Sequence, residues 1–501
     1  MADNTLTKGI KNIKYSLVAQ AVILIIGVLK SLIVPTVLSV DEYAYWQLYL
    51  FYIGYIGICY LGFNDGILLK YGKYNYDQLP FEKMRRSMQF YMVMLVIFAA
   101  AIFGYAMWLD DPDKSFVFTF VAASVLMYGL NGVFIYIFLI TNQIKRHSIF
   151  SAVDSVGSFL GILFILAIGK VDYHYLIYFV FSFKLLSVLI MLFLCRKTVF
   201  GKAGDVKEGF KEFVDNIRIG IFLMLAQIMS MLVTGLGKIF IENGESIAAV
   251  LNKVVNNLGS MTFGGIGDIK NYAYYSFGIT VLNIIMVGVT AVATVMYPTL
   301  SRVKSELLPK IFNKMYDYFS HFNVLVLFVY FPAYLFVQFF FEKYRPMLSY
   351  FAIMFITISW QAKVNITTNS YFRVLRMERK MFGINALSVV CFVVSYFFIS
   401  LIFKPVLNNP ITIVALSTMV SMIFLEMMAE KNIRKALNIK WDLHLLLDLM
   451  VNALFILCAI LPNKYIGMLF YGIIVLIYVI ARRKVVFADA KVLIKTFLKK
   501  Q

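Results

Sequence analysis

Apolar runs of about 20 residues recur along the whole chain, each long enough to cross the ~30 Å hydrocarbon layer of a bilayer as a helix. Residues 17–38, LVAQAVILIIGVLKSLIVPTVL, form one such run. With 61% hydrophobic and only 15% charged residues, the chain has too little polar surface for a water-soluble globule. A membrane β-barrel would show alternating segments of about ten residues. The sequence therefore predicts an all-α polytopic membrane protein.

The lengths of these runs predict 14 transmembrane helices. Because the number is even, both termini lie on the same side of the membrane. The predicted spans are 16–40, 44–69, 88–109, 115–141, 147–168, 174–195, 218–242, 271–297, 320–341, 347–368, 381–404, 410–429, 444–461 and 465–482.

The distribution of Lys and Arg predicts the orientation. Of the 47 such residues, eight fall in the loops on the side opposite the termini, four lie inside spans and 35 lie in the remaining loops and tails. Residues at the end of a span are counted here with the adjoining loop. Loops rich in Lys and Arg stay on the cytoplasmic side of a membrane. We therefore expect both termini in the cytoplasm.

Short matches in the same order indicate an internal repeat. Asn12-Ile13-Lys14 opens the first span and Asn216-Ile217-Arg218 opens the seventh, and Ala19-Gln20 corresponds to Ala226-Gln227. Repeated halves are common in transporters and locate the substrate site at their interface. The predicted domains are an N-terminal six-helix bundle at 1–200, a cytoplasmic linker at 201–217, a C-terminal six-helix bundle at 218–430, and at 431–501 spans 13 and 14 with a basic cytoplasmic tail.

The second half carries an insert of about twenty residues between spans 7 and 8. Apolar residues recur in it at helical spacing, which predicts an amphipathic helix near 245–258. Because this loop is expected outside, we expect the helix to lie on the outer membrane surface. The apolar residues are Ile247, Val250, Leu251, Val254, Val255 and Leu258.

Four lysines lie inside predicted spans: Lys30, Lys184, Lys238 and Lys363. A lysine at the centre of a membrane helix costs about 2.5–3.5 kcal/mol on insertion scales. Lys30 and Lys184 are deep, so we expect them to face a water-filled cavity. Lys238 and Lys363 lie nearer the ends of their spans, where snorkelling to the headgroups is an alternative role.

Other polar residues in the spans complete the candidate site. A basic cavity suits an anionic solute such as a phosphate or pyrophosphate, whereas a cation exporter needs deep carboxylates. Gln361, Asn365 and Asn369 form a stripe for which hydrogen bonding between helices is the alternative role. The substrate-binding candidates are Lys30, Lys184, Lys238, Lys363, Gln227, Gln361 and Asn365, and the gate or ion-coupling candidates are Asn64, Asp65, Asp154 and Glu426.

No metal centre or catalytic residue is predicted. The four cysteines lie in apolar runs and lack metal-ligand spacing, and the four histidines are scattered near helix ends. We expect no cofactor apart from coupling to H⁺ or Na⁺, for which the acids named above are the titratable candidates.

Three short stretches of the second span carry a resemblance to a known family. Tyr45-Trp46-Gln47-Leu48-Tyr49, Leu61-Gly62-Phe63-Asn64-Asp65-Gly66 and Lys70-Tyr71-Gly72 resemble bacterial polysaccharide flippases, the O-antigen (Wzx-type) transporters of the multidrug/oligosaccharidyl-lipid/polysaccharide (MOP) exporter superfamily. The resemblance implies a V-shaped, MOP-like pair of bundles that works by alternating access.

The resemblance also implies a function. Such a flippase translocates undecaprenyl-pyrophosphate-linked repeat units from the cytoplasmic to the outer leaflet of the bacterial cytoplasmic membrane for surface polysaccharide biosynthesis. It is not an enzyme, and its partners are membrane lipids, the lipid-linked glycan, a polysaccharide polymerase and glycosyltransferases; no nucleic acid is expected.

Other functions stay open at this point. A MOP-superfamily exporter of lipid II or of a cationic drug would have the same topology. A membrane polysaccharide polymerase or ligase would be expected to show a large outer loop with Arg, His or acidic residues for glycosyl transfer, and the longest outer loop here holds a mostly apolar helix and few charges.

Overall fold

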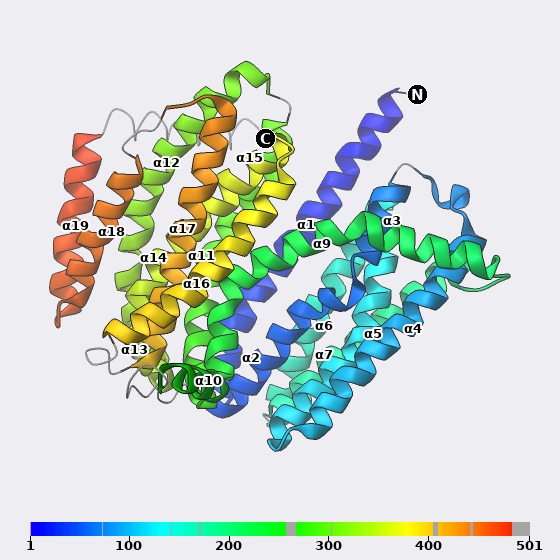
Figure 1. Ribbon diagram of the computed structural model, residues 1–501, viewed down its shortest axis with the longest axis horizontal. Helices are drawn as coiled ribbons and strands as arrows, with labels where there is room; N and C mark the ends of the chain where they lie inside the picture. Colours follow the sequence, from blue (N-terminus) through cyan, green and yellow to red (C-terminus); the bar gives the residue numbers. More distant parts are fainter. Residues whose placement is uncertain are drawn as a thin grey trace. The chain divides into compact units, whose positions relative to one another are not determined.

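The computed structural model describes residues 2–72, 74–141, 143–169, 172–256, 267–301, 303–403, 409–440 and 444–482. Within these ranges the regular secondary structure is entirely helical, with no strand (Figure 1). The predicted all-α class is confirmed.

The helices are long and apolar enough for a multi-pass membrane protein. Eleven described helices can cross a membrane by length and composition, and two bent pairs can each form one further span. His444–Ile460 is a shorter apolar helix. These segments match the 14 predicted spans one to one, so the predicted polytopic fold is confirmed.

The chain divides into two compact units, Met1–Ile228 and Met229–Gln501. The division falls inside α9 (Val206–Glu242), which is one continuous helix, whereas the sequence placed a linker at 201–217. Most of that stretch is therefore the beginning of α9. The first unit also contains α1 (Ala2–Val37), α2 (Val40–Tyr55), η1 (Ile56–Tyr60), α3 (Phe63–Tyr71), η2 (Tyr76–Gln78), α4 (Phe81–Trp108), α5 (Pro112–Ile140), α6 (Ile144–Ile168), α7 (Tyr173–Leu194) and α8 (Arg196–Val199).

The second unit contains the rest of α9 and the helices that follow it. In chain order these are α10 (Gly244–Asn256), α11 (Ile269–Leu300), η3 (Ser305–Leu307), α12 (Leu308–Phe328), α13 (Tyr330–Phe340), η4 (Glu342–Ser349), α14 (Phe351–Lys363), η5 (Val364–Thr368), α15 (Asn369–Val374), α16 (Glu378–Phe403), α17 (Pro410–Leu437), α18 (His444–Ile460) and α19 (Lys464–Ala481).

Local sequence signals explain several helix ends. Ser39 caps α2 and forms a capping box with Glu42. Asp111 caps α5 by accepting backbone hydrogen bonds from Asp113 and Lys114, and the proline that follows it stands at the first helical position, where its missing N–H costs nothing. These caps set where the spans begin.

The second span is bent by 60° between Val40–Tyr60 and Phe63–Tyr71. Leu61 and Gly62 take left-handed conformations there, with φ of 45° and 79°. Glycine adopts this region without the steric cost of a side chain. The bend gives α3 a direction different from that of α2.

The last two helices pack against one side of the second unit. α18 contacts α12 and α14, and α19 contacts α12 and α13, as Figure 1 shows at the end of the chain. The Tyr471 hydroxyl donates to the Val324 carbonyl at 3.3 Å, and Phe455 meets Tyr330 edge to face. The pair is thereby part of the core of this unit.

Candidate functional site

Lys30 joins α1 to α6 in the first unit. Its Nζ donates a 2.8 Å hydrogen bond to the Ser158 hydroxyl, and the side chain is half-buried. The Ser158 hydroxyl in turn donates to the Ser155 carbonyl. Lys30 is therefore held at a defined point on the α1–α6 contact.

Lys184 lies deeper in the same unit. Only 3% of the residue is exposed, and its Nζ lies 4.2 Å from the ring centroid of Tyr128 on α5. An ammonium group over an aromatic face gains about 2 kcal/mol or more when it is desolvated. The tyrosine ring thus lowers the cost of holding this charge between α5 and α7.

The two lysines lie at the same level of the first unit. A methyl group at Gly157 on α6 would stand 2.5 Å from the ring of Phe183 on α7, so the helices touch at these residues. Ser158 and Lys184 are the next residues along each helix. The structure therefore brings Lys30 and Lys184 to one level of α1, α6 and α7. The side chain of Asp154, one turn before Ser158, lies outside the described part of the structure.

Two further candidates lie on α9. Lys238, in the second unit, is 9% exposed, with its Nζ 5.7 Å from the ring centroid of Tyr272 on α11. Gln227 is exposed near the end of the first unit. These two positions belong to different units.

Lys363 lies among carboxylates in the second unit. It is 3% exposed, and its Nζ lies 3.2 Å from Asp448 Oδ2 and 3.6 Å from Glu426 Oε1. Its Nζ also lies 4.2 Å from the ring centroid of Tyr316. The charge of Lys363 is thus balanced inside the second unit, which removes the physical reason for assigning it to an anionic substrate.

Glu426 is the centre of this buried network. It is fully buried and accepts hydrogen bonds from the Tyr316 hydroxyl at 2.6 Å and the Thr368 hydroxyl at 2.8 Å. One turn along α17, Glu430 pairs with Arg434 at 2.6 Å. Side chains from α12, α14, α17 and α18 therefore form one ion network. Glu426 was predicted from the sequence as a gate or ion-coupling candidate, but its pairing with Lys363 was not predicted.

The polar stripe of the tenth span follows a distorted turn. Residues Val364–Thr368 form a π-helical turn, a feature that often occurs at functional sites. Gln361, Asn365 and Asn369 are half-buried along it, and Asn369 Nδ2 donates to Asn365 Oδ1 at 3.4 Å. The stripe thus has side-chain amides that are partly accessible along this span.

Asn64 and Asp65 lie buried at the start of α3. Asp65 Oδ1 accepts a hydrogen bond from the Tyr136 hydroxyl on α5 at 3.1 Å. Asn64 packs against Gly132 of α5 so closely that a methyl group added at Gly132 would overlap the Asn64 side-chain amide. Both side chains therefore help to fix α3 on α5.

The glycines of the same motif allow α9 to cross α3 closely. A methyl group at Gly62 would lie 2.5 Å from the backbone of Gly220, and one at Gly66 would overlap the Asn216 carbonyl. The two motif glycines are four residues apart, the small-xxx-small spacing that permits close helix packing. That spacing is the sequence signal from which this contact could have been predicted.

An ion pair closes the same junction, which we call the α3–α9 clamp (Gly62, Gly66, Lys70, Tyr71 and Glu212). Lys70 Nζ lies 2.8 Å from both carboxylate oxygens of Glu212, and the Tyr71 hydroxyl donates to Glu212 Oε1 at 2.5 Å. The motif that carried the family resemblance is therefore where α9 is fixed to the first unit.

No family model matches the chain, and no curated protein sequence matches it. Solved structures do match. An inward-closed structure of the lipid II flippase MurJ gives a TM-score of 0.56 at 13% identity and covers 95% of this chain and 100% of its own.

A second solved structure leads to the same fold. An inward-facing multidrug resistance MATE family transporter of the MOP superfamily gives a TM-score of 0.55 at 13% identity, covering 84% of this chain and 95% of its own. At such identities the likeness concerns the fold and leaves the substrate open. The chain has the fold of MOP-superfamily transporters.

Proposed function

We propose that the protein is a flippase that translocates undecaprenyl-pyrophosphate-linked oligosaccharide repeat units from the cytoplasmic to the outer leaflet, for surface polysaccharide biosynthesis. The observation that carries the proposal is the placement of Lys30 and Lys184 at one level of the first unit. The fold shared with a lipid II flippase over 95% of this chain supports it.

Lysines suit the cargo for electrostatic reasons. A pyrophosphate accepts charge-assisted hydrogen bonds from ammonium groups, and these are about twice as strong as neutral ones. A glycan that entered bare hydrocarbon would lose its hydrogen bonds with water at a cost of several kcal/mol per group. Lys30 and Lys184 would hold the headgroup in a polar passage while the lipid tail stays in the membrane. Lys238 is the third candidate of this kind.

The acids in the spans support a second element of the proposal, coupling to an H⁺ or Na⁺ gradient. Asp65 and Glu426 are buried and bonded to tyrosine hydroxyls, so protonation of either carboxylate would change its hydrogen bonding. We expect flipping in energised vesicles to stop when proton and sodium gradients are collapsed together. Undiminished flipping after that treatment would remove the coupling and leave the cargo assignment intact.

The proposal also fixes a location and neighbours. The protein would lie in the bacterial cytoplasmic membrane with both termini in the cytoplasm, between the glycosyltransferases that build the repeat unit and the polymerase that uses it. Cysteines placed in the loops and tested with a membrane-impermeant thiol reagent would check this orientation.

Accumulation of the cargo is the direct test of the function. In cells that lack the protein, lipid-linked repeat units should accumulate on the cytoplasmic face. Lys30→Met and Lys184→Met should cause the same accumulation at normal protein levels. Lys197→Met is the matched control, because the Lys197 side chain is 64% exposed and lies outside the spans.

Two results would contradict the proposal. Wild-type amounts of surface polysaccharide from both lysine variants would remove the binding role. Efflux of cationic dyes that is unaffected by Lys30→Met and Lys184→Met would instead favour a drug exporter of the same fold.

A further inference from the structure

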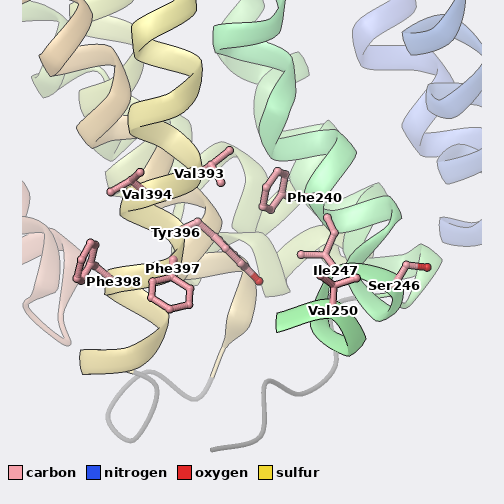
Figure 2. A pocket seen from close by; sticks show the side chains of 9 residues that line it. All are labelled: Phe240, Ser246, Ile247, Val250, Val393, Val394, Tyr396, Phe397 and Phe398. Carbon is pink, nitrogen blue, oxygen red and sulfur yellow. The ribbon is translucent and has the colours of Figure 1, made fainter. Parts of the chain in front are cut away.

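A groove of about 540 Å³ lies between α10 and α16 in the second unit, shown in Figure 2. Its volume is within the range of about 300–1,000 Å³ that is usual for small-molecule sites. The insert between spans 7 and 8, for which the proposed function has no role, supplies one wall. The lining residues are Phe240, Ser246, Ile247, Val250, Val393, Val394, Tyr396, Phe397 and Phe398.

The inner wall of the groove is aromatic and well packed. Phe240 meets Tyr396 at 4.9 Å and Phe392 at 4.9 Å between ring centroids, both edge to face. Ala248 of α10 is buried against Phe397. The wall is therefore a preformed apolar surface on which a hydrocarbon chain can lie.

The outer side of the groove is exposed along a helix that can span a membrane. Val393, Val394 and Phe398 are 45%, 46% and 55% exposed, and they lie on Glu378–Ile402, a stretch that can span a membrane. The medium around such a helix is hydrocarbon, which supplies the chains that fill an apolar groove.

A cation stands on the same stripe of α10 as two lining residues. Ser246, Val250 and Lys253 are spaced i, i+4 and i+7, so they share one face of the helix, and Lys253 is exposed. Amphipathic helices of this kind lie at the level of the headgroups. A lysine there attracts anionic lipid.

We propose that this groove binds one hydrocarbon chain of an anionic phospholipid whose phosphate contacts Lys253. The chain lies on Phe240 and Tyr396 between α10 and α16, and the headgroup lies at the exposed stripe of α10. The proposal is independent of the proposed flippase function, since it concerns a resident membrane lipid and not the cargo.

Native mass spectrometry of the full-length protein tests the site. The protein is transferred from nanodiscs of phosphatidylglycerol or of phosphatidylcholine, and retained lipid is counted. Phosphatidylglycerol should be retained in preference. Val394→Trp fills the groove and should abolish retention, whereas Val390→Trp, on the same helix, 54% exposed and outside the lining, should not.

The headgroup contact is tested separately. Lys253→Gln should weaken phosphatidylglycerol binding about fivefold, the effect of one basic residue near an anionic surface, and Lys253→Arg should restore it. Free inorganic phosphate should not compete, because the chain supplies most of the binding. Val250→Trp, on a 63% exposed position of α10, is a second groove-filling variant should Val394→Trp fail to fold.

Three outcomes would overturn the proposal. Equal retention of the two lipids, unchanged in Lys253→Gln, would show that the site does not select an anionic headgroup. Retention that survives both groove-filling substitutions would show that the lipid binds at another site on the protein. Absence of retained lipid in the unsubstituted protein would show that the groove does not bind phospholipid.

Discussion

Lys184 in the first unit and Lys363 in the second are buried to the same extent, each only 3% exposed, and the contacts described for them are of different kinds. Lys184 lies over the ring of Tyr128. Lys363 lies between two carboxylates, those of Glu426 and Asp448. Both lysines are expensive in a membrane span. The difference teaches that burial of a cation alone does not assign its role, and that the chemistry of its partner does.

The two environments lead to opposite expectations for substitution. Where carboxylates surround a buried lysine, its removal leaves anions without a counter-charge, so the loss appears in stability. The contacts of Lys184 with Tyr128 and of Lys30 with Ser158 are of another kind, a ring contact and a hydrogen bond. Because we propose that these two lysines bind the cargo, their substitution should appear in transport.

The largest expected effect is that of Lys363→Met. It should lower the free energy of unfolding by about 3–5 kcal/mol, the usual cost of removing one partner of a buried ion pair. Equilibrium unfolding in mixed detergent micelles measures it. Adding Glu426→Gln and Asp448→Asn should recover much of the loss. A change below about 1 kcal/mol together with lost transport would break the comparison and return Lys363 to the substrate.

Glu212→Gln tests whether a paired charge is structural in the first unit as well. It removes the carboxylate bonded to Lys70 and Tyr71 in the α3–α9 clamp. The free energy of unfolding should fall by about 1–2 kcal/mol, a modest loss because Lys70 is partly exposed to solvent. A double-mutant cycle with Lys70→Met measures the coupling between the two side chains. Coupling near zero would show that the glycine contacts alone hold α9 on α3.

Lys184→Met should change the free energy of unfolding by about 1 kcal/mol or less, since a cation–π contact is lost and an apolar side chain gained. Repeat units should accumulate nonetheless. Tyr128→Phe is the matched control because it keeps the aromatic face that Lys184 contacts. Should Lys184→Met destabilise the protein as strongly as Lys363→Met, the two lysines would have the same structural role.

Of the substitutions at the lysine contacts, Ser158→Ala should have the smallest effect on transport. It removes the acceptor for Lys30 and should lower the free energy of unfolding by about 0.5–1.5 kcal/mol. Transport should be reduced but not lost, because the ammonium group of Lys30 remains. Unfolding and flipping are measured on the same preparation. A transport defect equal to that of Lys30→Met would indicate that the hydroxyl itself contacts the cargo.

The spans were predictable because bilayer thickness fixes the length of an apolar run. All 14 correspond to described helical segments, including the bent ones. The bends themselves were not predicted. Hydropathy reports length and not direction, so neither the 60° bend before Phe63 nor the 73° bend between Glu342–Ser349 and Phe351–Val374 leaves a trace in it.

The candidate site was predictable only in part. Unusual lysines stand out in apolar runs, and Lys30 and Lys184 were found in this way. Their partners were not, because Ser158 is 128 residues from Lys30 and Asp448 is 85 residues from Lys363. No local pattern pairs residues at such separations. Spans 13 and 14 were assigned to 431–501, outside the two six-helix bundles, and α18 supplies the Asp448 carboxylate to the ion network.

The π-helical turn at Val364–Thr368 holds one residue more than an α-helical turn would. If that surplus residue were passed along the chain, each residue that it passes would rotate by about 100° and shift by about 1.5 Å along the axis. Thr368 would then leave the Glu426 carboxylate, and a neighbour would take its place. The π-helical turn would thus let the tenth span change register by one residue. A small axial slide would then exchange the side chain that faces Glu426 without unfolding the helix.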